Sequence, residues 1–332
     1  MSTDSGKNLM VSIIIPVYQA KDTLRRCVES CLSQREISPE EMEIILVDDG
    51  SSDGSDVICD ELSGNRDGVK ISVKHTENHG VSHARNLGVD LAKGRFIVFV
   101  DSDDEVTNVF LSNLLKHADE ATMLVDETKS YNNAQKISGF QYIENSILNE
   151  NTHVWGKLIE RKALTEAGIR FKEGLAIGED LLFMLDLALF ADKRRCIRCI
   201  PEGNYIYNEN ENGAMNSSFK RSYLDQILCW RQTEEKLLEV KENISPYAFV
   251  SVAVSQILTA LLVIGKVATQ TGERDAALDK EAMDQAIGQI NHALKVRGAF
   301  AALSMGHKLK VMILKFDREL YLKLYARHKA TA

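Results

Sequence analysis

The sequence predicts an α/β fold, with a mostly parallel sheet flanked by helices and an all-α region at the C-terminal end. Two stretches, Ile44–Asp53 and Phe96–Asp104, begin with the β-branched and aromatic residues typical of buried strands. Both then end in acidic and turn-forming residues, and in an open α/β sheet ligands bind where the strands end. From residue 220 onward the pattern is helical throughout.

Strand and helix patterns alternate along residues 11–126, with short links. The predicted strands are Val11–Pro16, Glu43–Asp48, Val69–His75, Phe96–Asp101 and Met123–Asp126. The predicted helices are Thr23–Ser33, Ser55–Leu62, Val81–Lys93 and Asn108–Glu120. This alternation, with apolar strands, predicts a parallel sheet covered by helices on both faces. No Gly-x-Gly-x-x-Gly follows the first strand, which argues against a dinucleotide-binding fold of the usual kind.

The pattern is less regular over residues 127–219. It contains a helix over Leu181–Ala191 and strand-like runs at Cys196–Pro201 and Tyr205–Tyr207. The helices expected after this region are Arg221–Val240, Pro246–Ala268, Ala276–Lys295 and His307–Arg327. We therefore expect one domain over residues 1–219 and a helical region over residues 220–332, with the boundary near residue 219.

The composition is that of a soluble globular protein, with 44% hydrophobic and 27% charged residues in 332. A net charge of −8 argues against nucleic-acid binding, which requires a basic surface. The N-terminal residues show no secretory signal pattern. The six cysteines form no disulfide framework, and packing is favoured over metal binding for the isolated pair Cys196 and Cys199. These features predict a cytoplasmic protein with reduced thiols.

Carboxylates follow both of the acidic strands. Asp48 and Asp49 can accept hydrogen bonds from a ligand, or simply close an Asx-type turn. Asp101 and Asp103 stand two residues apart at a strand end, so both can point toward one hard divalent cation. Such an ion keeps positions free for phosphate oxygens. The alternative is that Asp101 and Asp103 favour the N-terminus of the following helix electrostatically.

Two further polar motifs stand at predicted helix starts. Arg85, one turn into a helix, can stack on a flat ring or bind a phosphate, or it can pair with Asp49 or Asp101. Glu179 and Asp180 open a helix, where an acidic pair also suits the helix dipole. Each motif alone leaves both interpretations open.

Taken together, these motifs resemble family 2 glycosyltransferases over about residues 10–218. The matching pieces, in family order, are Pro16-Val17-Tyr18, Asp48–Asp53, Asn78–Gly88, Asp101–Asp104, Trp155–Leu158, Gly178–Asp180 and Tyr205–Tyr207. The resemblance implies a GT-A fold, with a nucleotide-sugar half over about residues 10–126 and an acceptor half over about residues 127–219.

The resemblance also implies a role for individual residues. Asp49 is expected to contact the uracil, with Arg85 and the Pro16-Val17-Tyr18 loop around the nucleoside. Asp101 and Asp103 resemble the family's Asp-x-Asp pair, in which Asp103 is the expected ligand of Mg²⁺ or Mn²⁺. Asp180 resembles the general base. Asp48, Asp101 and Ser102 are also expected to contact the donor. Glu179, next to Asp180, is expected to belong to the catalytic pair.

The implied activity is inverting transfer of a hexose or N-acetylhexosamine from a UDP-sugar to a hydroxyl of a glycan or lipid-linked acceptor. The metal neutralises the leaving diphosphate, and a carboxylate removes the proton of the attacking hydroxyl. By family analogy the product is a bacterial surface polysaccharide or glycoconjugate. The alternative is a non-catalytic nucleotide-sugar-binding partner subunit of another transferase. Residues 127–153 carry no motif that identifies the acceptor.

Two segments of the helical region bear on partners. Ile244–Gly265 contains no charge over 22 residues, which is long enough to span a membrane, but Ser251, Ser255 and Thr259 form a small polar stripe that favours packing within a bundle. Residues 307–329 hold seven Lys or Arg, and one expected helical face carries Leu309, Ile313, Phe316, Leu320 and Leu324. This pattern fits either a membrane-surface helix or a bundle helix with a solvated face. We expect residues 220–332 to mediate homodimer formation, peripheral contact with an anionic membrane at its inner face, or both.

Overall fold

The structure is a computed structural model that describes residues 9–128, 132–149, 151–191, 196–201, 203–209, 219–270 and 275–331. Residues 1–8, where the sequence shows no secretory signal pattern, lie outside these ranges. Residues 210–218, next to the domain boundary predicted near residue 219, also lie outside them. The chain divides into two units, Met1–Asn210 and Glu211–Ala332.

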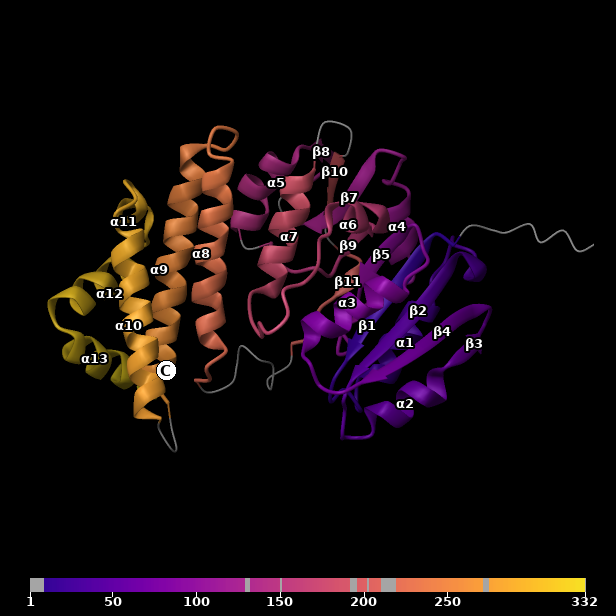
Figure 1. The fold of residues 1–332 in the computed structure, drawn as a ribbon, viewed down its shortest axis with the longest axis horizontal. Coiled ribbons are helices and arrows are strands. Elements are labelled where there is room, and N and C mark those ends of the chain that lie inside the picture. Colours follow the sequence, from indigo (N-terminus) through magenta and orange to yellow (C-terminus); the bar gives the residue numbers. More distant parts are fainter. Residues whose placement is uncertain are drawn as a thin grey trace, which may run out of the picture. The chain divides into compact units, whose positions relative to one another are not determined.

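One mixed β-sheet organises the first unit, with helices packed around it (Figure 1). The strand order is β3-β4-β2-β1-β5-β9-β7-β10-β8. The strands are β1 (Val11–Val17), β2 (Met42–Asp49), β3 (Gly64–Arg66), β4 (Val69–Thr76), β5 (Phe96–Phe99), β7 (Thr122–Thr128), β8 (Gln135–Ile137), β9 (Lys157–Glu160) and β10 (Cys196–Pro201). Strands β4, β2, β1 and β5 are parallel neighbours, which confirms the predicted α/β fold. Beyond β5 the sheet becomes mixed, because β9 runs antiparallel to both β5 and β7.

A second, two-stranded sheet joins distant parts of the chain. Strand β6 (Glu105–Val106) pairs antiparallel with β11 (Tyr205–Ile206). This pairing holds the turn that follows β5 against the segment at residues 204–208. The chain order alone does not indicate such a contact, since about a hundred residues separate the two strands.

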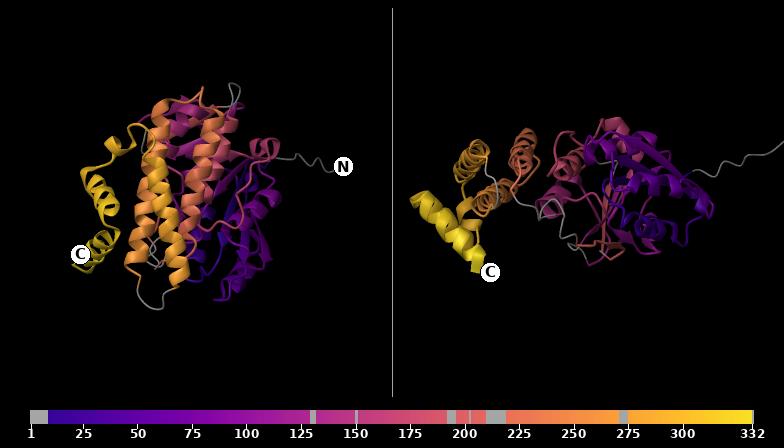
Figure 2. Two further views of the ribbon diagram at one scale, coloured as in Figure 1. Left: turned by 60° about the vertical axis from the view of Figure 1, so that its left-hand side comes forward. Right: turned by 90° about the horizontal axis from the view of Figure 1, so that it is seen from below.

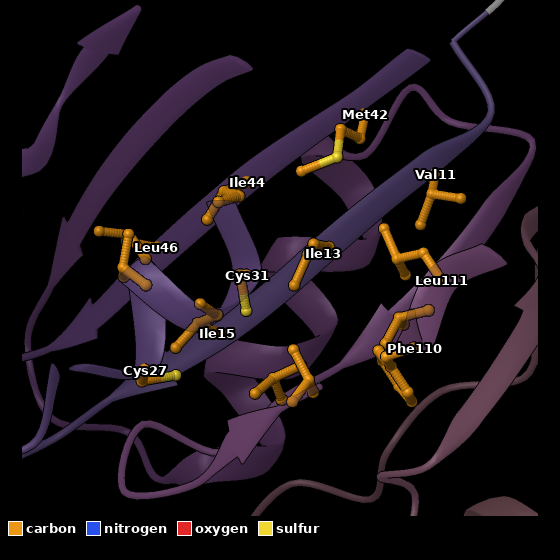
Figure 3. Packing of buried hydrophobic residues seen from close by; sticks show 14 of the residues in the cluster. Val11, Ile13, Ile15, Cys27, Cys31, Met42, Ile44, Leu46, Phe110 and Leu111 are labelled. Atoms are coloured by element: carbon orange, nitrogen blue, oxygen red, sulfur yellow. The ribbon is translucent and has the colours of Figure 1, made fainter. Parts of the chain in front are cut away.

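Alternate side chains along the strands point to one face of the sheet. This face packs against the helices α1 (Leu24–Leu32), α2 (Ser55–Leu62) and α4 (Phe110–Leu115), and part of this core is shown in Figure 3. Ile13 and Ile15 of β1 point to this face, where Cys27 and Cys31 of α1 meet them. The helices of the first unit are α1 (Leu24–Leu32), α2 (Ser55–Leu62), α3 (Val81–Leu91), α4 (Phe110–Leu115), α5 (Gly139–Asn145), α6 (Arg161–Ala167) and α7 (Glu179–Phe190). Short 3₁₀ turns lie at η1 (Pro39–Glu41) and η2 (Ile147–Asn149).

Helix α3 covers the opposite face of β1 at very short range. A Cβ atom at Gly88 would lie 2.3 Å from Cγ2 of Ile14, so only glycine allows this approach. Ile14 belongs to the alternate set of β1 residues that points away from α1. Close packing here fixes the position of Arg85, which lies one turn earlier on α3.

The structure corrects several predicted elements of this unit. The helix predicted over Asn108–Glu120 is only α4, because the chain turns at Lys116–Ala118. The strand predicted over Tyr205–Tyr207 ends at Ile206. Strand β9 and helices α5 and α6 were not predicted. In β10, Cys196 and Cys199 are buried and free, as packing residues are.

Six helices make up the described part of the second unit: α8 (Tyr223–Glu239), α9 (Pro246–Ala268), α10 (Ala276–Ala293), α11 (Ala299–Ala302), α12 (Met305–Phe316) and α13 (Arg318–Thr331). Helices α8, α9 and α10 run alongside one another (Figure 2). Among the described residues α9 is long and apolar enough to cross a membrane, yet 61% of its most apolar window is buried. Its buried face includes Val252 and Gln256, whereas the predicted packing stripe of Ser251, Ser255 and Thr259 is only half-buried.

The tail is two helices rather than the single predicted helix over His307–Arg327. Helix α12 ends at Phe316, and Asp317 leaves the helical conformation with φ −152°. The Asp317 Oδ1 atom accepts a hydrogen bond from the Leu320 backbone N–H at 3.0 Å, which caps the start of α13. The apolar residues Leu309 to Leu324 therefore do not form one continuous helical face. Side chains beyond Arg327, including Lys329 of the predicted basic run, lie outside the described residues.

Candidate active site

The loop that follows β1 is tied to the loop that follows β2. The Gln19 backbone N–H, at a positive φ of 52°, donates to Ser51 Oγ at 3.2 Å. Of the three residues predicted to surround a nucleoside, Pro16 and Val17 are buried within β1, whereas Tyr18 is 52% exposed. Tyr18 is therefore the side chain of this loop that is available to a ligand.

Asp49 ties the β2 loop to the turn before α3. Its Oδ1 accepts from the His79 backbone N–H at 2.9 Å, and its Oδ2 accepts from the Gly80 N–H at 2.8 Å. Gly50, with φ +73°, allows the close approach, since a Cβ there would lie 2.7 Å from the Asn78 nitrogen. A carboxylate has about four acceptor positions, so these two bonds leave capacity for a ligand amide. The predicted contact of Asp49 with uracil stays a prediction.

Asp48 shows the turn-closing contact that the sequence left open. Its Oδ1 accepts from the Ser51 backbone N–H at 3.1 Å, and its Oδ2 lies 2.8 Å from His75 Nδ1. The hydrogen bond that His75 makes to the Asp48 carboxylate raises the pKa of His75. A donor contact for Asp48 stays a prediction.

Arg85 is the centre of the candidate site. Its Nη2 donates to Asp101 Oδ1 at 3.0 Å, and its Nη1 donates to Asp180 Oδ1 at 2.7 Å and Glu179 Oε1 at 3.2 Å. The Arg85 side chain is only 5% exposed and lies over the ring of Phe171, 5.3 Å from its centroid. One guanidinium from α3 thus joins the end of β5 to the start of α7. Pairing with Asp101 was one of the alternatives to ligand binding that the sequence left open for Arg85, and it is present. The predicted contact of Arg85 with a nucleoside stays a prediction.

The electrostatics of this cluster favour a base that titrates near neutrality. Burial raises the pKa of Asp180 to about 7; Arg85 and Lys157 oppose this shift, while Glu179 and Asp101 add to it. The Asp180 side chain is still 21% exposed, whereas that of Glu179 is 10% exposed. Asp180 is therefore the more accessible carboxylate of the pair.

The acidic turn after β5 is anchored by a residue that was not among the predicted site residues. Asp104 is fully buried, and its Oδ2 accepts from the Tyr205 hydroxyl at 2.7 Å. The same hydroxyl accepts from the Asp101 backbone N–H at 3.1 Å. Burial raises the pKa of Asp104 to about 6. The only sequence signal for the role of Asp104 was its place in the Asp101–Asp104 motif. Ser102 and Asp103 lie half-buried on the turn that Asp104 anchors.

The carboxylates of this turn suit a hard divalent cation. Asp101 keeps 28% of its side chain exposed while its Oδ1 bonds to Arg85. Within the described residues no group of three His, Cys, Asp or Glu side chains is arranged to enclose a metal. One or two carboxylates suit such a cation when phosphate oxygens and water supply its remaining ligands. Asp101 and Asp103 are suitable donors by type, and their predicted contact with a metal stays a prediction.

A buried ion pair joins β7 to β9 and was missed by the sequence reasoning. Lys157 Nζ lies 2.9 Å from Asp126 Oδ1, and both side chains are 0% exposed. Asp126 Oδ2 also accepts from the Tyr142 hydroxyl at 2.8 Å and from Asn151 Nδ2 at 2.7 Å. The sequence offers one signal, a lysine within an otherwise apolar run at Lys157–Ile159.

Aromatic rings stack beside the acidic turn. Trp155 lies between His153, at 3.5 Å between ring centroids, and Tyr205, at 4.6 Å, and both rings are within 15° of parallel to it. Tyr207, whose ring centroid lies 5.9 Å from that of Trp155, is 59% exposed. The same Tyr205 whose hydroxyl holds Asp101 and Asp104 therefore belongs to an aromatic stack with an exposed end.

Comparison with known proteins shows which family this chain resembles. Residues 12–173 match Glycosyl transferase family 2. The chain is 30% identical over 229 residues to "Uncharacterized glycosyltransferase EpsJ" of Bacillus subtilis, covering 64% of each chain. It is 28% identical over 239 residues to "Succinoglycan biosynthesis protein ExoO" of Rhizobium meliloti, covering 66% of each. It is 31% identical to "Minor teichoic acid biosynthesis protein GgaB" of B. subtilis over 62% of this chain and 24% of that protein. The match thus spans less than two thirds of each of these relatives.

Solved structures show the same fold. TarS of S. aureus, in a crystal structure in complex with UDP-GlcNAc, aligns with a TM-score of 0.54 and 18% sequence identity. The alignment covers 96% of this chain and 88% of that chain. At this level of identity the likeness establishes the fold.

Proposed function

This chain carries a family 2 glycosyltransferase domain, and from that premise we propose that it transfers a sugar from a UDP-sugar donor to a hydroxyl of a glycan or lipid-linked acceptor, with inversion at the anomeric carbon. The names of its relatives, which include succinoglycan and teichoic acid biosynthesis proteins, support a role in bacterial polysaccharide synthesis. The complex of the like-folded TarS with UDP-GlcNAc supports a uridine diphosphate donor.

The observation that carries this proposal is the Arg85 cluster. Asp101, at the end of β5, and Asp180, at the start of α7, both bond to one buried guanidinium at 3.0 and 2.7 Å. The two carboxylates that the reaction needs, one toward the diphosphate and one toward the acceptor, are therefore held at a fixed spacing. A positioned pair of this kind provides the orientation on which such displacement reactions depend.

In the proposed reaction Asp180 takes the proton of the acceptor hydroxyl as that oxygen attacks the anomeric carbon. A base is most effective when its pKa lies near the working pH, and burial brings the pKa of Asp180 to about 7. Glu179, bonded to the same Nη1 of Arg85, helps to hold that guanidinium in place beside the base. No second carboxylate is assigned as a covalent nucleophile, which is why we propose inversion.

The donor would lie along the loops after β1, β2 and β5. Tyr18, 52% exposed, would face the nucleoside, and Asp49 would accept from its uracil amide. Asp101 and Asp103 would hold Mg²⁺ or Mn²⁺, which when bound neutralises charge on the departing diphosphate. Arg85 keeps Asp101 oriented through its bond at 3.0 Å.

Titration calorimetry with UDP, in the presence of Mn²⁺ and then without metal, tests the proposal. We expect UDP binding that tightens with Mn²⁺, because Asp101 and Asp103 would hold the cation and its charge would attract the diphosphate. Asp103→Asn should weaken the metal-dependent part of the affinity and leave the metal-free part nearly unchanged. Absence of UDP binding under both conditions would refute the proposal. A screen of UDP-glucose, UDP-galactose and their N-acetyl forms for slow hydrolysis would then identify the donor.

A further inference from the structure

Helix α12 carries apolar side chains on two opposite faces. Val311 and Leu314 are buried against the rest of the second unit. On the other side lies a stripe of exposed apolar side chains, spaced four, three and four residues apart. Its members are Met305, which is 77% exposed, Leu309 (55%), Met312 (51%) and Phe316 (88%). At 100° per residue these four side chains fall on one side of the helix, opposite the buried pair. We refer to these four residues as the α12 stripe.

The α12 stripe is more than scattered surface hydrophobicity. Single exposed apolar residues are normal, whereas contiguous ones mark an interaction surface. Leu320 and Leu324, on the neighbouring helix α13, are 41% and 44% exposed as well. The α12 stripe is therefore a solvent-exposed apolar surface of the kind that binds a partner.

Basic side chains line one flank of the stripe. By the same helical angle, Lys308 and Lys315 lie on this flank, whereas Lys310 lies nearer to the buried face, with its Nζ 5.6 Å from the ring centroid of Tyr325. Across residues 305–327 the basic residues, which outnumber Asp317 and Glu319, are Lys308, Lys310, Lys315, Arg318, Lys323 and Arg327. This surplus of positive charge stands in a chain whose net charge is −8.

We propose that the α12 stripe is a docking surface for an anionic lipid bilayer. Apolar side chains on one face with lysines along its edge, here Lys308 and Lys315, are the composition of a helix that lies in the membrane interface, with lysines at the headgroups. A second copy of this chain is a poorer occupant. A symmetric dimer through this face would place its positive charge against itself.

Sedimentation of the full chain with lipid vesicles tests this surface without any donor or acceptor. Vesicles of phosphatidylcholine alone are compared with vesicles that also contain phosphatidylglycerol, at low and at high salt. We expect binding to the anionic vesicles at low salt and its loss at high salt, because salt screens the lysine attraction. Failure to bind anionic vesicles at low salt would overturn the proposal.

Two double variants separate the apolar and the electrostatic parts. Leu309→Ser with Phe316→Ser should weaken vesicle binding at least about tenfold through lost apolar burial. Lys308→Gln with Lys315→Gln should weaken it about fivefold per lysine. The control is Val57→Ser, since Val57 on α2 is 54% exposed, almost the same as Leu309. All variants should melt at the temperature of the parent protein, because the changed side chains are exposed.

Unchanged binding in the Leu309→Ser and Phe316→Ser variant would overturn the proposal. Light scattering gives the other decisive outcome. A dimer that this variant converts to monomer, together with weak vesicle binding, would show that a second copy covers the stripe instead. Calorimetry with UDP on the same variant should give the affinity of the parent, which keeps this test independent of the proposed catalytic function.

Discussion

The two parts of the sheet are stabilised in different ways. In the parallel part, the interiors of β1, β2 and β5 are apolar apart from Ser12 and Glu43, which are bonded to each other, and the aspartates stand at the strand ends. In the mixed part, β9-β7-β10, an ion pair lies inside the core: Lys157 and Asp126 are paired at 2.9 Å with no exposure. Apolar burial is non-directional, whereas a buried ion pair requires both of its partners. The parallel part therefore has its candidate site residues at the strand ends, and the mixed part depends on a few polar contacts in its interior.

The largest effect should come from breaking the buried pair. Lys157→Met leaves Asp126 charged and uncompensated in the core, which should cost about 3–5 kcal/mol of unfolding free energy. Chemical denaturation measures this loss. The matched control is Lys162→Met, since Lys162 is 72% exposed and its ion pair with Glu166 should contribute less than about 1 kcal/mol. Equal stability of the two variants would contradict the difference drawn between the two parts of the sheet.

A smaller loss is expected where β11, in the two-stranded sheet, meets the acidic turn. Tyr205→Phe removes the hydroxyl that donates to Asp104 and accepts from Asp101, which should cost about 1.5–3 kcal/mol for a bond to a charged group. Denaturation should show this loss, and calorimetry should show weaker metal-dependent UDP binding. Tyr207→Phe is the control, because Tyr207 is 59% exposed and its change should alter stability by less than about 0.5 kcal/mol. A Tyr205→Phe variant as stable as this control would refute the anchoring role.

The parallel part is most sensitive where helix and strand approach closely. Gly88→Ala places a Cβ at 2.3 Å from Ile14, so α3 must shift, at a cost of about 1–3 kcal/mol. Gly288→Ala on α10 meets no atom within 4 Å and should instead stabilise the protein by up to about 1 kcal/mol. Opposite signs in thermal denaturation are the expected result. Two changes of the same sign would show that the contact of α3 with β1 is not tight.

The same contrast explains what the sequence could predict. Strands β1, β2 and β5 were predicted to within two residues at each end, because continuous apolar runs identify buried strands. Strand β9 was missed, since a lysine at Lys157 is read as an exposed position unless its partner Asp126 is known. The break at Asp317 was missed because the apolar spacing continues through it.

The candidate site was predicted in part for a related reason. Asp101, Asp180 and Arg85 were identified from motifs, and the pairing of Arg85 with Asp101 was one of the alternatives considered. Its bond to Asp180 joins residues 95 positions apart and could not be read from spacing. Asp104 was overlooked because its partners, Tyr205 and Asn208, are equally distant in sequence.

The pH dependence of turnover tests the role proposed for Asp180, which Arg85 links to Asp101 at the end of the parallel strand β5. Burial raises the pKa of this carboxyl to about 7, and only its deprotonated form can accept the acceptor's proton. Turnover should therefore fall as the pH drops through about 7, well above the pH at which an exposed aspartate would lose its charge. Initial rates from pH 5.5 to 8.5 measure this. A rate that stays constant down to pH 5.5 would contradict the shifted pKa.

Asp180→Asn tests the central claim most directly, that Arg85 joins a donor-binding edge to a separate catalytic base. UDP affinity with Mn²⁺ should stay nearly intact, because the proposed donor contacts are those at the ends of β1, β2 and β5. Turnover should fall by about a hundredfold or more, which is a common contribution of general-base catalysis. Asp186→Asn, on the same helix α7, is the matched control and should keep the parent's turnover. Near-normal transfer by Asp180→Asn would contradict the account and assign the base to another group, with Glu179 the nearest candidate.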